Sequence, residues 1–166
     1  AGPGDALVVE WGEGRRRWRM LVDAGPGASW DAVGARLRAR PRESYELFVV
    51  THVDEDHIGG ALRLLHDADL APRVQAVLFN GYVHCQRGGN VLGPVHGEQL
   101  TQRIVDAALP WNPGRPQPIA PGVGGPVVVA SAGELPALDL PGGARAVLLS
   151  PSGPKLRKMA GVWEDA

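Results

Sequence analysis

Four side chains that can bind a metal ion lie within six residues of one another. They are His52, Asp54, Asp56 and His57, and they follow an apolar segment, 46–50, that predicts a buried strand. Core packing requires no such cluster, whereas imidazole and carboxylate groups together suit zinc, iron or manganese. Because alternate residues of an extended chain point the same way, His52 and Asp54 can face one pocket, with Asp56 and His57 on the following loop. The spacing predicts a metal site in which a position stays open for water.

The elements that would position this cluster follow from the apolar spacing, which predicts an α/β layered domain. Gly59 and Gly60 are expected to turn the backbone tightly into a helix. Proline and glycine are frequent between residues 110 and 126, which predicts a loop there. Strands are expected at 6–11, 18–23, 47–51, 74–79, 127–131 and 145–149, and helices at 30–39, 61–67, 98–109 and from 154 onward, with a hairpin turn at 12–14.

The cluster resembles the metal-binding signature of the metallo-β-lactamase fold superfamily, H-x-H-x-D-H, with Asp54 in place of the second histidine. The resulting H-x-D-x-D-H, followed by Ile-Gly-Gly, is similar to the metallo-domain of bacterial DNA-uptake channel proteins and to a group of uncharacterised bacterial hydrolase-like proteins. Supporting likenesses are Gly-Asp before the first strand, Asp-x-Gly after the second, and segments 79–82 and 111–112. The resemblance covers most of residues 4–150. It implies an αββα sandwich with metals at one edge between two sheets.

The resemblance also implies a role for each motif residue. His52 and Asp54 would contribute to one metal, and Asp56 and His57 to a second. Asp56 would orient or deprotonate the bridging water, which makes it the expected catalytic residue. One or two zinc ions are expected, with manganese as the alternative, since a carboxylate at position 54 adds negative charge and hardness.

Other candidates lie outside the motif. His84 follows the strand expected at 74–79, where the superfamily carries an intermediate histidine ligand, although a solvated loop histidine is the alternative. Asp23 could hydrogen-bond a ligand histidine from the second coordination sphere. The alternative is that Asp23 only stabilises the turn that follows the strand. Asp5, at the start of the first strand, is a candidate for the same second-sphere role.

The later ligands of the superfamily have no counterpart here. They are an aspartate after a late strand and a final histidine, and Asp139 lies in a different context, Leu-Asp-Leu-Pro-Gly. We therefore expect a single domain over residues 1–166 that is incomplete, holding the N-terminal half to two-thirds of the sandwich. The start at Ala1 without Met also suggests a fragment. A protein partner or a C-terminal segment would then complete the site.

The residues leave three functions open. A metal-dependent hydrolase could cleave a phosphodiester of nucleic acid or a nucleotide, which the Asp54 variant favours because it resembles nuclease-like members. The same site could instead hydrolyse a carbonyl substrate such as a lactone, thioester or β-lactam. The chain could also be a non-catalytic half of a split metallo-domain that acts as an interaction module. Arginines near the hairpin tip could bind phosphate, or they could blunt a sheet edge: Arg15, Arg16, Arg17 and Arg19.

Composition bounds these alternatives. A chain of 166 residues with 44% hydrophobic residues is long enough for one domain with a core. The net charge of −1 gives no whole-molecule electrostatic case for nucleic acid or membrane binding. No apolar run approaches the roughly 18 residues needed to span a bilayer, and no signal-peptide pattern begins the chain. A lone cysteine, Cys85, excludes an internal disulfide and favours a reducing, cytoplasmic location.

Overall fold

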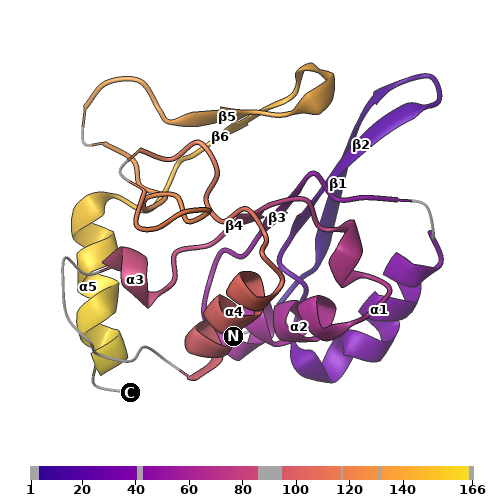
Figure 1. Ribbon diagram of the computed structural model, residues 1–166, viewed down its shortest axis with the longest axis horizontal. Helices are drawn as coiled ribbons and strands as arrows, with labels where there is room; N and C mark the ends of the chain where they lie inside the picture. Colours follow the sequence, from indigo (N-terminus) through magenta and orange to yellow (C-terminus); the bar gives the residue numbers. More distant parts are fainter. Residues whose placement is uncertain (1–3, 41–42, 86–94, 117, 131, 165–166) are drawn as a thin grey trace.

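The described residues form a mixed α/β fold around a four-stranded sheet (Figure 1). The α/β class expected from the spacing is confirmed. The structure is a computed structural model, which describes residues 4–40, 43–85, 95–116, 118–130 and 132–164.

The sheet has the strand order β1-β2-β3-β4 and mixes two pairing directions. Strands β1 (Leu7–Glu13) and β2 (Arg16–Val22) form an antiparallel hairpin, and β3 (Leu47–Val49) and β4 (Val77–Leu78) run parallel to β2. The hairpin turn therefore lies after Glu13, later than the expected 12–14. Because β2, β3 and β4 are parallel, the loops that follow them meet at one edge of the sheet.

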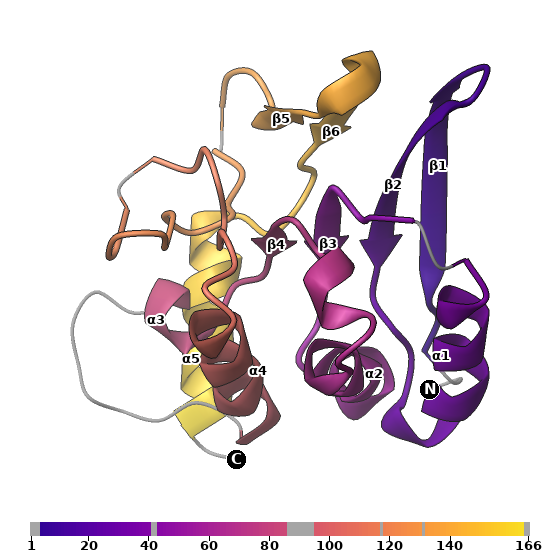
Figure 2. The ribbon, with the colours of Figure 1, turned by 45° about the vertical axis from the view of Figure 1, so that its right-hand side comes forward.

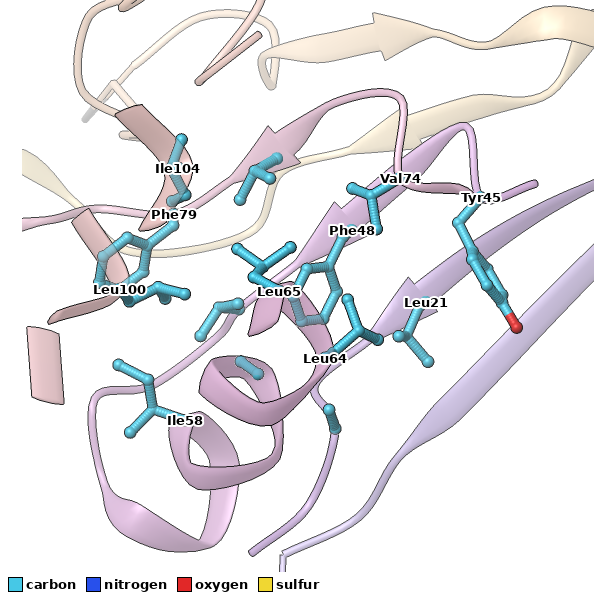
Figure 3. Close-up of a cluster of buried hydrophobic side chains, with 14 of the residues drawn as sticks. Leu21, Tyr45, Phe48, Ile58, Leu64, Leu65, Val74, Phe79, Leu100 and Ile104 are labelled. Carbon is cyan, nitrogen blue, oxygen red and sulfur yellow. The ribbon is translucent and has the colours of Figure 1, made fainter. Parts of the chain in front are cut away.

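Alternation along these strands sends two apolar rows to opposite faces of the sheet. Leu21, Phe48 and Val77 are register partners on adjacent strands, and each has no exposed surface. This row packs against apolar side chains of the helices, among them Ile58 and Leu64 of α2 (Figure 3). Three helices lie on this side of the sheet (Figure 2): α1 (Trp30–Arg38), α2 (Glu55–His66) and α4 (Val95–Asp106).

The opposite face is covered by a smaller antiparallel sheet of β5 (Ala137–Asp139) and β6 (Arg145–Val147) (Figure 2). Around these strands, Leu138 and Leu148 pack against the second row, which contains Leu47 and Leu78. The turn η3 (Pro141–Gly143) reaches the β1–β2 hairpin, where Trp11 Nε1 donates a 2.7 Å hydrogen bond to Pro141 O. Strands β3 and β4 thus lie buried between a helical layer and a two-stranded layer, whereas β1 is mostly exposed.

Helix α2 begins earlier than the sequence predicts, and this changes the place of the motif. Asp54 is its N-cap residue, so Asp56 and His57 lie in the first helical turn rather than on a loop. Gly59 and Gly60 are inside the helix, not at a turn before it. A Cβ on Gly60 would lie 2.0 Å from Ala24 O, and one on Gly59 would lie 2.5 Å from Gly27 N. The glycine pair serves close contact between α2 and the loop after β2.

Other boundaries differ because long-range pairing defines them. Residues 127–130 form only an isolated bridge, Val129 to Ser152, where a strand was expected over 127–131; residue 131 lies outside the described residues. Strand β5 was not expected. Strands β3, β4 and β6 are shorter than the expected 47–51, 74–79 and 145–149. Among the helices, α3 (Tyr82–Cys85) and the 3-10 turns η1 (Gly27–Ser29) and η2 (Ala71–Arg73) are additional, α4 starts and ends three residues early, and α5 (Gly153–Glu164) starts one residue early. None of the described helices is both long and apolar enough to cross a bilayer.

The contact between α2 and Ala24 predicts an unusual response to alanine. In an open helix, Gly→Ala raises stability by about 1 kcal/mol. Gly60→Ala should instead lower the free energy of unfolding by about 2 kcal/mol, because its Cβ collides with a backbone oxygen. Urea denaturation measures this. Gly97→Ala in α4 is the matched control, since the nearest atom to its Cβ is Val53 Cγ1 at 3.8 Å. Equal effects of the two substitutions would contradict the close contact.

Candidate metal centre

The structure brings the four motif residues together at the carboxyl edge of β3. His52 Nδ1 lies 3.0 Å from Asp54 Oδ2, and His57 Nε2 lies 3.6 Å from Asp56 Oδ2. The rings of His52 and His57 have centroids 5.5 Å apart. The side chains of His52 and Asp54 are mostly exposed, whereas those of Asp56 and His57 are about 30% exposed. Asp56 and His57 are thus held by the first turn of α2, whereas the side chains of His52 and Asp54 are exposed to solvent.

Asp23 connects this cluster to the end of β2. It is buried and has a positive φ of 52°. Its Oδ1 accepts a 2.8 Å hydrogen bond from Thr51 N, and its Oδ2 accepts one from Thr51 Oγ1. The same Oδ2 lies 2.9 Å from His57 Nδ1. This hydrogen bond raises the pKa of His57 above its ordinary value, against the opposing effect of burial.

The contact with Asp23 selects one tautomer of His57. With a carboxylate beside Nδ1, a neutral His57 keeps its proton there and presents the Nε2 lone pair toward Asp56. Carboxylates orient metal-binding histidines in this way. Asp23 thus has the geometry expected of the second-sphere group predicted from its sequence context.

Asp5 lies near the motif, but its role stays a prediction. Gly4 packs so closely on the helix start that a Cβ would lie 1.7 Å from Asp56 O. The Asp5 residue that follows is exposed. Hydrogen bonds among the described residues do not join Asp5 to a motif histidine.

His84 lies on α3 and has a different environment from the motif. It is buried, and its Nε2 lies 3.2 Å from Gly124 O and 3.1 Å from Asn112 Nδ2. Its ring meets Trp111 edge-on at 4.6 Å between centroids. Burial lowers the pKa of His84 to about 4. A ligand role, which stays a prediction, would require His84 to leave these contacts; the structure does not bring it to the motif.

Two asparagines that were not predicted as site residues, Asn80 and Asn112, hold the proline- and glycine-rich segment after α4 against the end of β4. The part of this segment that we call the glycine-rich loop comprises residues 110–116 and 118–126. Asn80 exchanges a pair of 2.8 Å hydrogen bonds with the backbone of Val127. The fully buried Asn112 accepts a 2.9 Å hydrogen bond from Phe79 N and donates one to Phe79 O. An amide directly after a buried strand was the available signal, because such a group needs a buried partner.

A pocket of about 380 Å³ opens beside His52. Its lining comes from the ends of β3 and β4, Val127, the segment after β6, and α5. Besides His52, the lining contains the apolar side chains of Val49, Leu78, Val127, Leu148 and Met159.

The arginine-rich hairpin tip lies at the opposite edge of the sheet from the motif. Arg16 begins β2, and Asp23 follows its end, so about 20 Å of strand separates them. Arg19 Nη2 is 2.9 Å from both Glu10 and Glu43, and Arg16 stacks over Trp18. These contacts favour the interpretation that the arginines cover a sheet edge.

Among the described residues, no three His, Cys, Asp or Glu side chains form a preassembled metal cage. The motif residues are paired in twos, His52 with Asp54 and His57 with Asp56. No family model and no curated protein matches this chain, so the interpretation of the site rests on its own residues.

The raised pKa of His57 predicts how stability depends on pH in metal-free protein. The bond to Asp23 is strongest when His57 is protonated, so its contribution is complete below the unfolded pKa of about 6.5 and is lost as pH rises through the higher folded pKa. His57→Gln should therefore destabilise the chain by on the order of 1 kcal/mol at pH 5.5 and by less at pH 8.5. His66→Gln, at an exposed position of α2, is the control.

Urea denaturation at both pH values measures this difference. An NMR titration should also show the pKa of His57 falling toward its ordinary value in Asp23→Asn. A pH-independent effect of His57→Gln would contradict the charged pair.

The lowered pKa of His84 predicts a pH dependence of stability opposite to that of His57. Its folded pKa of about 4 lies below the unfolded value, so the unfolded chain binds more protons between these two values and acid destabilises the fold. Between pH 7 and pH 5 this single group should remove about 2 kcal/mol of stability. His84→Gln should lose correspondingly less over the same interval in urea denaturation. An identical acid response in the variant and the parent would mean that His84 is accessible to water.

Proposed function

We propose that this chain is a hydrolase domain that works with bound zinc or manganese, held by His52, Asp54, Asp56 and His57. The observation that carries the proposal is the 2.9 Å contact between Asp23 and His57. A buried carboxylate on Nδ1, with Nε2 directed toward the remaining motif groups, is the arrangement that metal-binding histidines use.

The donor set fits the implied metal. Two imidazoles and two carboxylates suit zinc, and the carboxylate at position 54 also suits manganese. When bound, such an ion lowers the pKa of its water and polarises the bond under attack. Asp56 lies at the start of α2 beside His57, where it can orient the attacking water or take its proton. Asp54 holds His52 at Nδ1, which leaves Nε2 of His52 for binding.

We infer that the fold is the N-terminal part of a metallo-β-lactamase sandwich. The layer order supports this: helices, a mixed four-stranded sheet, and a second small sheet on the other face. The outer side of β5–β6 also exposes apolar residues, Leu135, Val147 and Leu149, as expected of a domain over 1–166 that another layer completes.

Two substrate classes remain within this proposal. Resemblance to nuclease-like members supports a phosphodiester of nucleic acid or a nucleotide. Of the arginines that would have strengthened that choice, Arg19 is paired with Glu10 and Glu43, and Arg17 lies 3.7 Å from Glu10. The apolar pocket beside His52 favours the carbonyl alternative.

Metal content tests the proposal. Protein purified without added metal, then reconstituted with zinc or manganese and desalted, should hold one or two ions per chain by mass spectrometry. The double variant His52→Ala, His57→Ala should lose at least one ion, because each substitution removes an imidazole ligand. The variant His66→Ala, His96→Ala removes two exposed histidines outside the motif and should keep the full content.

Absence of metal from the parent protein would overturn the proposal for this chain alone. It would favour the alternative of a non-catalytic half-domain, for which the exposed apolar residues of β5–β6 are the supporting observation.

A further inference from the structure

We propose that the pocket beside His52 binds the apolar acyl chain of an ester or thioester whose carbonyl is hydrolysed at the motif. The hydrolysis step rests on the proposed function, whereas the binding of the acyl chain does not.

The pocket has the size and lining of an alkyl site. Its volume of about 380 Å³ is roughly two and a half times that of a cavity that admits benzene. Val49 and Leu78 form its floor on the sheet, and Leu148 and Met159 approach from the segment after β6 and from α5. Since a cavity of roughly 150 Å³ holds the six carbons of benzene, this pocket has room for a linear chain of about eight carbons.

The charge of the lining argues against phosphate. Lys, Arg, Asp and Glu are missing from the lining among the described residues. Two of its polar side chains already have partners: Thr51 Oγ1 donates to Asp23, and Asn80 pairs with Val127. An anionic phosphodiester placed here would lose hydration without gaining a cation, while an alkyl chain gains from leaving water.

The place of His52 connects the pocket to the motif. His52 lines the pocket, and its ring centroid is 5.5 Å from that of His57. A substrate with its chain against Leu78 therefore presents its carbonyl at the rim, beside the groups assigned to metal and water. Water adds to the carbonyl carbon, the bond to the leaving alcohol or thiol breaks, and the leaving group takes a proton, which yields a carboxylic acid.

Binding is measured first, on the metal-free full chain. Isothermal titration with aliphatic carboxylates of two to twelve carbons should show affinity rising about fourfold per methylene and levelling off near eight carbons. Leu148→Trp fills the pocket and should move this plateau to shorter chains. Leu149→Trp is the matched control, because Leu149 is 76% exposed and is not part of the lining. Met159→Phe is a second filling variant in case Leu148→Trp does not fold.

Hydrolysis is measured second, on zinc- or manganese-loaded protein. p-Nitrophenyl esters of the same chain lengths are compared with bis-p-nitrophenyl phosphate. The octanoate should exceed the acetate in kcat/KM by at least tenfold, and Leu148→Trp should reduce that ratio about tenfold, whereas Leu149→Trp should preserve it.

The two measurements separate the two claims. Chain-length-dependent binding without metal-dependent hydrolysis would support the acyl pocket and overturn the hydrolase. If the rate of ester hydrolysis depends neither on chain length nor on Leu148→Trp, the acyl-pocket proposal is overturned and the hydrolase proposal is retained. Faster cleavage of the phosphodiester than of every ester would also overturn the acyl assignment.

Discussion

The carboxylate of Asp23 is the constraint on which the arrangement of the site depends. Its backbone N–H donates to Val49 O, and its side chain binds Thr51 and His57. One buried residue thus ties the end of β2 to the end of β3 and to the first turn of α2. Because a buried carboxylate without partners costs several kcal/mol, these three segments hold one relative position. The left-handed backbone of Asp23 (φ 52°) turns the chain toward that position.

Close helix packing supports the same arrangement from the other side. Gly60 N donates to Gly25 O at 2.8 Å, and the missing Cβ of Gly60 leaves space for Ala24 O. Helix α2 therefore rests directly on the loop that follows Asp23. Its burial of Ile58 against the sheet then sets the orientation of the turn that carries Asp56 and His57. Apolar packing and one polar network act on the same short segment.

The pKa values of two histidines shift in opposite directions because their environments differ. His57 is partly exposed and lies beside the buried carboxylate of Asp23, which favours its protonated form. His84 lies among Trp111, Asn112 and the glycine-rich loop, where burial keeps it neutral. The apolar wall of the pocket beside His52 is built by segments that are distant in sequence. The shape of this pocket is therefore a property of the assembled layers.

The sequence by itself determined the features that rest on local spacing: the buried strand before His52, the helix at 30–39, the hairpin, and the cluster of side chains whose types can bind a metal ion. It also named Asp23 as a candidate second-sphere group, with turn chemistry alone as the alternative. Only the tertiary structure decided the rest. The start of α2, the pairing of β5, the burial of His84 and the distance of the arginines from the motif depend on partners far along the chain. Gly59 and Gly60 show the physical reason: glycine allows either a turn or a close approach, and the carbonyl of Ala24 decides between them.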